Sequence, residues 1–125
     1  MPDTDHLEAW TLMSAIAAVT ERLGIGTLVL CNSYRNPALL AKMASSLDQV
    51  SNGRLLLGLG AGWMDEEYRA YGFDYPTPGV RVAQLAETIE LIRAMWTQSR
   101  SSSQGRPSRR GPKAVHPVAL WPSGR

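Results

Sequence analysis

The chain has a single cysteine, Cys31, and no hydrophobic run of the length needed to cross a membrane. One cysteine excludes an intramolecular disulfide framework and fits a reducing compartment. The first residues, Met1 to His6, are acidic and lack the basic-then-apolar order of a secretory signal. We therefore expect a cytoplasmic protein that does not enter a membrane.

Acidic residues are absent from the last 27 positions. Residues 1–98 hold seven basic and all eleven acidic residues, a formal charge of −4, whereas residues 99–125 hold six basic residues, a charge of +6. Eighteen of these 27 residues are Ser, Arg, Pro or Gly, a composition that supports no helix or strand period. We expect one globular domain over 1–98 and a disordered basic tail over 99–125. The two histidines, His6 and His116, show no metal-ligand spacing, and no metal site is expected.

Apolar periodicity predicts helices over 6–23, from 37 to an end near Asn52 and Gly53, over 64–71 and over 81–96. Asp5 or Thr4 is the expected N-cap of the first helix, and Asn36 with Pro37 is expected to start the second. That second helix is expected to bury Leu39, Leu40, Met43, Leu47 and Val50.

Two apolar runs without alternation, over 25–31 and 54–60, predict strands that are buried on both faces. A helix of crossover length separates these strands, which predicts a βαβ unit with a parallel sheet. The fold class is therefore α/β, with roughly two parallel strands and flanking helices.

The second strand ends in a glycine-rich stretch, Gly58 to Trp63, followed by three acids, Asp65 to Glu67. The glycines superficially resemble a dinucleotide-binding loop, but the acids would repel a phosphate and no strand follows. We expect instead that the glycines leave the backbone open to a ligand. The alternative role of the acids, general acid–base chemistry, competes with simple stabilisation of a helix start.

Several stretches carry a family resemblance in the same order along the chain. They are Leu7–Leu12, Gly26–Val29, Tyr34–Lys42, Asn52–Trp63, Glu66–Gly72 and Leu91–Thr97. Together they resemble the luciferase-like monooxygenase superfamily, and most closely its actinobacterial deazaflavin-dependent branch. These enzymes are (β/α)8 barrels that use FMN or the deazaflavin coenzyme F-420. The resemblance implies that this chain is a fragment, a partial TIM barrel from the second to the fourth helix, since a complete barrel needs about 250 residues.

The resemblance also implies cofactor-binding positions at the barrel mouth. Relatives carry a bulge there, often with a non-prolyl cis peptide, which would fall around Leu28–Val29. The expected cofactor-binding residues are Leu28, Val29, Leu30, Cys31, Asn32, Gly60, Gly62 and Trp63. No catalytic residue is assigned, because the carboxylate and amide that some deazaflavin enzymes carry at Trp63 and Glu66 are not kept.

Each site candidate has a plainer alternative. Cys31 has no evident partner base and is expected to be a small residue at a strand end rather than a nucleophile. Asn32 either faces the ligand or caps a loop. Trp63 either walls the pocket or covers the barrel end.

The function implied is that of a fragment of a flavin- or deazaflavin-dependent oxidoreductase, inactive on its own. Hydride transfer or oxygenation of a small-molecule substrate would occur at the mouth of the intact barrel. Two alternatives stay open: half of a split enzyme reconstituted with a complementing chain, and a noncatalytic binding module that uses the basic tail. Self-association through exposed strand edges is expected, and specific nucleic-acid binding is not. The abrupt change near Gln98 suggests a shift of reading frame, with a natural disordered tail as the alternative.

Overall fold

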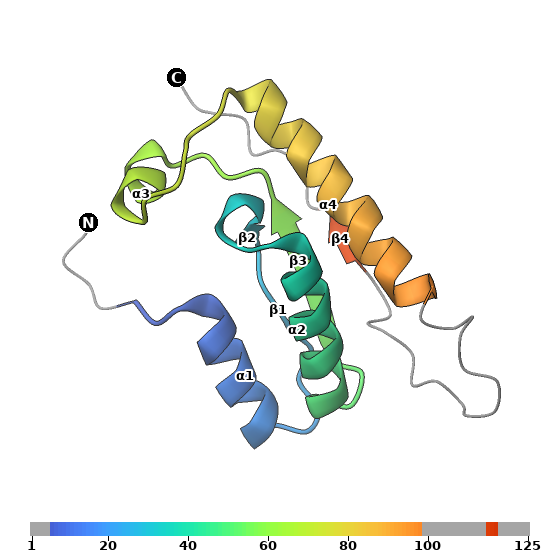
Figure 1. The fold of residues 1–125 in the computed structure, drawn as a ribbon. Helices are drawn as coiled ribbons and strands as arrows, with labels where there is room; N and C mark the ends of the chain where they lie inside the picture. The colour runs from blue at the N-terminus through green and yellow to red at the C-terminus, as the bar shows by residue number, and fades with distance from the viewer. Residues whose placement is uncertain (1–5, 99–114, 118–125) are drawn as a thin grey trace.

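The computed structural model describes residues 6–98 and 115–117, and these form a small parallel sheet with helices packed against it (Figure 1). The elements follow the order expected from the sequence, with one further strand. They are α1 (Ala9–Val19), β1 (Ile25–Gly26), β2 (Leu30–Cys31), the 3-10 helix η1 (Asn32–Tyr34), α2 (Pro37–Val50), β3 (Leu55–Gly60), α3 (Asp65–Ala70), α4 (Pro78–Gln98) and β4 (Val115–Pro117).

β3 is the central strand. β1 and β2 both pair with it in parallel, and β4 pairs with it in parallel as well. Leu59 is aligned with both Leu30 and Pro117, so β2 and β4 lie on opposite edges of β3. Val115–Pro117, within the tail predicted to be disordered over 99–125, form β4, where β3 offers a free edge whose backbone groups need partners. The rest of that expectation lies outside the described residues.

The strand predicted over 25–31 is interrupted. Gly26 and Leu30 are four residues apart, but their partners Leu56 and Leu59 are only three apart, so β1 and β2 form one strand line with one extra residue. This is a β-bulge, which bends a strand and re-aims its side chains. The peptide bond between Leu28 and Val29 inside the bulge is cis. Both features lie where the family resemblance placed them.

The long helices begin at side-chain caps. Asn36 accepts hydrogen bonds from the backbone N–H groups of Ala38 and Leu39, with Pro37 at the first helical position, as predicted. α1 is capped by Glu8, whose carboxylate accepts from the N–H groups of Trp10 and Thr11. The cap predicted at Asp5 or Thr4 is wrong, because α1 begins later than its apolar pattern suggested.

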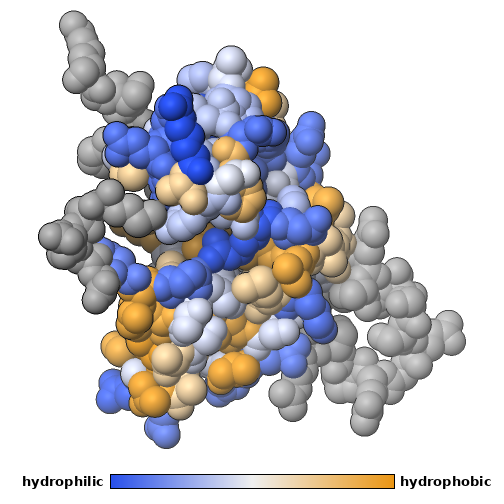
Figure 2. All heavy atoms as spheres, turned by 60° about the vertical axis from the view of Figure 1, so that its left-hand side comes forward, coloured by the Kyte–Doolittle hydropathy of each residue, from blue (hydrophilic) through white to orange (hydrophobic). Residues whose placement is uncertain are grey.

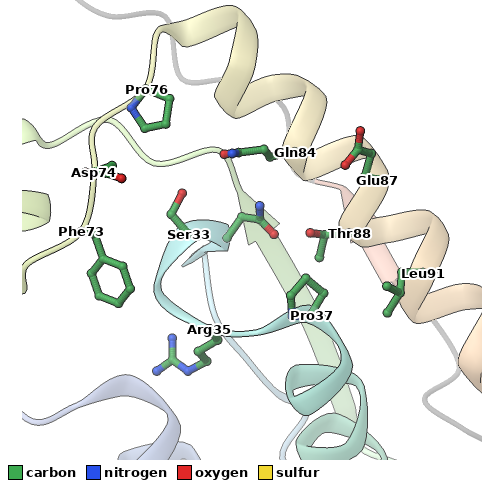
Figure 3. A pocket seen from close by; sticks show the side chains of 11 residues that line it. Ser33, Arg35, Pro37, Phe73, Asp74, Pro76, Gln84, Glu87, Thr88 and Leu91 are labelled. Atoms are coloured by element: carbon green, nitrogen blue, oxygen red, sulfur yellow. The ribbon is translucent and has the colours of Figure 1, made fainter.

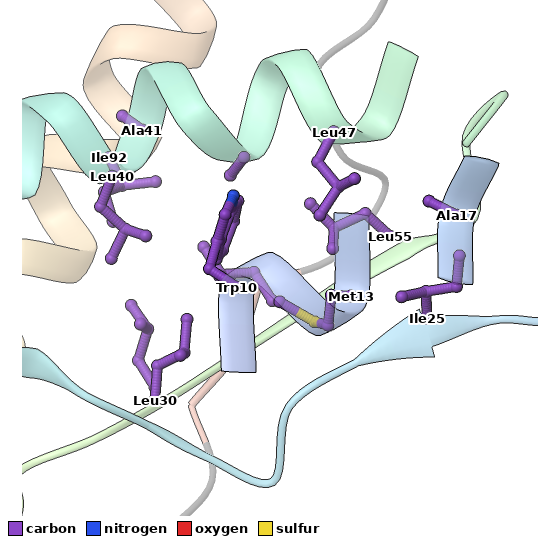
Figure 4. Close-up of a cluster of buried hydrophobic side chains, with 13 residues drawn as sticks. Trp10, Met13, Ala17, Ile25, Leu30, Leu40, Ala41, Leu47, Leu55 and Ile92 are labelled. Carbon is purple, nitrogen blue, oxygen red and sulfur yellow. The ribbon is translucent and has the colours of Figure 1, made fainter. Parts of the chain in front are cut away.

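One core lies between the helices and one face of the sheet (Figure 4). Trp10 and Met13 of α1 pack there against Leu47 of α2, and Ile92 of α4 joins them. From the strands come Ile25, Leu30, Leu55, Leu57 and Leu59. Side chains alternate along β3, so Leu55, Leu57 and Leu59 face the helices and Leu56 faces the opposite side of the sheet.

The opposite face of the sheet is not covered by any element among the described residues. Leu28 is 88 % exposed and Leu56 is 49 % exposed. The expectation that both strands are buried on both faces is therefore wrong for this face. Leu39 and Val50 of α2 are also exposed, because they lie on the outer side of that helix.

Hydrophobic side chains also reach the surface on the helical side. Figure 2 shows them gathered in the lower half of the view, at the height where α1 and the end of α2 lie in Figure 1. Leu12 and Val19 of α1 are among the exposed apolar residues. Within the described residues, no helix combines the length and the apolar character that crossing a bilayer requires.

Candidate functional site

The carboxyl ends of β2 and β3 lie side by side, because Cys31 is aligned with Gly60 in the parallel ladder. The residues that follow both strands therefore meet at one edge of the sheet. In parallel barrels and open α/β sheets this edge is where ligands bind. Of the predicted cofactor-binding residues, Cys31 and Gly60 end these two strands.

The glycines of β3 make room for the bulge. A Cβ at Gly58 would overlap the carbonyl oxygen of Thr27, and a Cβ at Gly60 would press against the side chain of Val29. The hydroxyl of Thr27 also donates to the carbonyl of Gly58 at 3.2 Å. The space that we expected Gly60 to leave for a ligand is thus occupied by Val29, and the bulge can form only because β3 lacks side chains there.

The bulge and the loop after β3 expose apolar side chains. Leu28 is 88 % exposed, Val29 39 % and Trp63 68 %. Exposure of this kind leaves apolar surface available for a flat, apolar ligand face. These three residues fit the role that the resemblance implies for them.

Two of the other predicted residues lie elsewhere. Leu30 is buried in the core on the helical face of the sheet. Asn32 is 6 % exposed and lines a separate pocket, which none of Leu28, Val29, Gly60 and Trp63 lines. The structure therefore brings together only part of the predicted set.

Tyr68 of α3 connects the ends of β2 and β3 and is completely buried. Its hydroxyl lies 2.8 Å from the Ser33 Oγ and 3.2 Å from the Ala61 carbonyl oxygen, as donor, and accepts from the Cys31 thiol at 3.3 Å. Burial, together with the hydrogen bond from Cys31, raises the pKa of Tyr68 to about 12. Cys31 is thus hydrogen-bonded to a phenol, and its role as a small residue at a strand end stays a prediction.

Gly62 packs directly on this hydroxyl. Its φ of 76° lies in the left-handed region, which favours glycine. A Cβ at Gly62 would overlap the Tyr68 hydroxyl and would lie 2.7 Å from the Cys31 Sγ. The turn after β3 is therefore built against Tyr68 and Cys31.

A second phenol, Tyr34, donates to the Glu67 carboxylate at 2.9 Å. Burial and this hydrogen bond both raise the pKa of Tyr34 well above its ordinary value. The Tyr34 ring contacts those of Tyr68, Tyr71 and Phe73, with centroids 5.0, 5.7 and 5.2 Å away. Glu67 is thus a hydrogen-bond acceptor for Tyr34 besides lying in the first turn of α3.

The pocket that contains Asn32 has a volume of about 470 Å³ and lies between η1, α4 and the loop before α4 (Figure 3). Gln84, Glu87, Thr88 and Leu91 line it from α4, and Phe73, Asp74 and Pro76 line it from the loop. The Asn32 Oδ1 is buried and has no hydrogen-bond partner among the described residues. The pocket is on the helical side of the sheet, away from the exposed apolar residues of the bulge.

Arg81 of α4 is a buried cation. Its guanidinium lies 4.2 Å from the ring centroid of Tyr75 and donates to the carbonyl of Pro76, while its Nε has no partner in the described part of the chain. Tyr75 in turn donates to the Trp63 carbonyl at 2.8 Å. Arg81 and Tyr75 thereby hold the loop before α4 close to Trp63.

Over residues 6–98 and 115–117, no three His, Cys, Asp or Glu side chains are grouped as a metal site requires.

Tyr34, Tyr68 and Arg81 were not predicted as functional residues from the sequence. A usable signal was present for the two tyrosines, since both lie in stretches that carry the resemblance. For Arg81 no local signal exists, because its burial depends on a loop whose course the sequence does not predict.

Comparison with known proteins agrees with this geometry. A profile of the luciferase-like monooxygenase family matches residues 1–122. The chain belongs to this family. The match includes most of 99–125, for which disorder and a shift of reading frame stay predictions.

The relatives include both deazaflavin-dependent enzymes and monooxygenases. An F420-dependent glucose-6-phosphate dehydrogenase of Amycolatopsis mediterranei is 40 % identical over 98 residues, covering 78 % of this chain and 29 % of the relative. A pyrimidine monooxygenase of Serratia proteamaculans is 39 % identical over 106 residues, covering 81 % and 28 %. An uncharacterized protein of Mycobacterium tuberculosis is 34 % identical over 125 residues, covering 98 % and 43 %. The chain thus spans less than half the length of these relatives.

Solved structures show the same fold. An F420-dependent secondary alcohol dehydrogenase in complex with an F420–acetone adduct superimposes with a TM-score of 0.71 at 25 % identity, covering 91 % of this chain and 34 % of that one. The monooxygenase RslO1 from Streptomyces bottropensis gives a TM-score of 0.65 at 28 % identity, covering 84 % and 31 %. The chain therefore has the fold of part of a luciferase-like barrel.

Proposed function

We propose that this chain supplies the part of a flavin- or deazaflavin-dependent oxidoreductase that supports the cofactor ring, and that it performs no turnover on its own. The cofactor, coenzyme F-420 or FMN, supplies the redox chemistry when bound. The residues of this chain would pack against the ring through Leu28, Val29 and Trp63. The observation that carries the proposal is the bulge, which leaves Leu28 exposed on the uncovered face of the sheet.

The proposal assigns separate tasks to the two faces of the sheet. The helical face is packed and stabilises the fold, while the bulged face presents exposed apolar side chains. A planar ring that covers Leu28 and Trp63 would remove their apolar surface from water, which favours binding. A reducing, cytoplasmic location fits the single thiol.

A titration of the purified chain with FMN and with coenzyme F-420, followed by tryptophan fluorescence, tests the proposal. Trp63 lies at the proposed contact, so quenching should saturate with a Kd on the order of micromolar. Leu28→Asp should weaken binding at least about tenfold, because a charge replaces apolar contact with the ring. Leu39→Asp is the matched control, since Leu39 is an exposed leucine on α2. Absence of saturable binding in the unaltered chain, or equal loss in both variants, contradicts the proposal.

We propose as a second possibility that a complementing chain completes the barrel. The uncovered face of the sheet, with Leu28 and Leu56 exposed, favours this reconstitution. Turnover of a small-molecule substrate would then appear only when both chains are present. The noncatalytic module based on the basic tail has no observation in its favour among the described residues.

A further inference from the structure

We propose that Tyr68 is a positioning residue whose phenol oxygen holds the turn at Ala61 and Gly62 against the end of β2, and so sets the affinity for the cofactor. This inference rests on the proposed function, because it concerns the same edge of the sheet. It assigns a role to a residue that is fully buried and therefore cannot contact the cofactor itself.

The contacts of Tyr68 come from both strand ends. Ala61 follows β3, Cys31 ends β2, and Ser33 lies in η1, which continues from β2. One hydroxyl lies within 2.8 to 3.3 Å of hydrogen-bonding atoms in all three. Since a phenol has one proton, it donates to Ser33 or to Ala61 while accepting from the thiol. No other side chain in the described residues is hydrogen-bonded to both strand ends.

Gly62 gives the second, independent observation. Its backbone approaches the Tyr68 hydroxyl so closely that no Cβ fits between them. Loss of the oxygen would leave a gap beneath the turn and would remove the acceptor of the Cys31 thiol. Trp63, 68 % exposed, follows directly, so any movement of Gly62 changes where the indole lies.

Contacts of the Tyr68 ring with two neighbouring aromatic rings keep its hydroxyl in place. The Tyr68 ring contacts Tyr34 and Tyr75, with centroids 5.0 and 4.9 Å away in edge-to-face geometry. Two neighbouring rings restrict the phenol to one orientation. A Phe at this position would keep these ring contacts and lose only the oxygen, which separates positioning from packing.

The test compares Tyr68→Phe with Tyr71→Phe. Tyr71 is one turn further along the chain and also contacts Tyr34, but its hydroxyl has no hydrogen bond among the described residues. We measure the cofactor Kd of each variant well below its melting temperature, together with the amide hydrogen exchange of Gly62 and Trp63. Tyr68→Phe should weaken binding of FMN or coenzyme F-420 at least about tenfold and accelerate exchange at both amides, and Tyr71→Phe should do neither.

The outcomes separate this inference from the proposed function. If Tyr68→Phe lowers the melting temperature but leaves the Kd and the exchange of Gly62 as in Tyr71→Phe, Tyr68 is merely structural and the inference is wrong. If the unaltered chain binds neither cofactor, the proposed function fails for the isolated chain. Amide exchange then decides whether Tyr68 holds the turn: faster exchange at Gly62 in Tyr68→Phe alone supports the positioning role, and equal exchange overturns it.

Discussion

Arg54, the residue before β3, joins three parts of the chain through one guanidinium. It donates to the carbonyl oxygens of Ala17, Thr20 and Leu23 at the end of α1, at 3.0, 2.7 and 2.7 Å. It also donates to the Thr20 hydroxyl at 3.1 Å and to the Ser51 carbonyl at 2.6 Å. The last carbonyls of a helix need such partners, since they have none within the helix.

Arg54→Lys should therefore destabilise the fold although the charge is kept. A lysine has three donors on one nitrogen and cannot reach five acceptors in this arrangement. We expect a loss of about 2 kcal/mol in the free energy of unfolding, measured by urea denaturation. Arg69→Lys, at an exposed ion pair with Asp65, is the control and should change it by less than about 0.5 kcal/mol. If Arg54→Lys changes the free energy of unfolding no more than Arg69→Lys does, Arg54 acts only through its charge, which a lysine keeps.

At the scale of elements, the start of α1 depends on an ionised cap. Burial opposes ionisation of Glu8, but the hydrogen bonds from Trp10 and Thr11 and the charge of Arg35 outweigh it and lower the pKa of the carboxyl below 4.5. Arg35, just before α2, also forms an ion pair with Glu8. The cap thus links the starts of the two helices that pack together.

The lowered pKa of Glu8 predicts a pH dependence. Because the folded state releases this proton more readily, its stabilisation is complete above the unfolded pKa near 4.5 and is lost as the pH falls through the lower, folded value. Glu8→Gln should be less stable at pH 7 by about 1 kcal/mol and should lose less on acidification than the unaltered chain. Unfolding curves from pH 7 to pH 3 check this, with the exposed Glu21→Gln as control. Identical acid profiles for Glu8→Gln and the unaltered chain would contradict it.

At the scale of the whole molecule, the two faces of the sheet differ in what covers them. The helices bury one face, while Leu28 and Leu56 stay exposed on the other. Apolar surface next to unpaired strand edges promotes association between chains.

Self-association should therefore run through the uncovered face. We expect the purified chain to increase in apparent size with concentration in sedimentation velocity, and Leu56→Lys to reduce this increase markedly. Val19→Lys, at an exposed apolar residue on α1, is the control and should have little effect. If Val19→Lys reduces association as much as Leu56→Lys, the helical side and not the sheet forms the contact.

The sequence by itself determined the order and type of the elements, since helical periodicity and unbroken apolar runs depend only on neighbouring residues. It also determined the Asn36 cap, and the family resemblance that located the bulge at Leu28–Val29. Glu8 was missed as a cap because nothing local separates it from the acids before it.

Only the tertiary structure decided what the site residues face. The extra residue between β1 and β2, opposite β3, leaves Leu28 exposed, and the packing of α3 brings the Tyr68 hydroxyl to both strand ends. Burial of Asn32 and Arg81 likewise depends on α4 and the loop before it. The contacts of Tyr68 with Cys31 and Ser33 join residues about 30 or more positions apart, so they follow from how the elements pack and not from any local pattern.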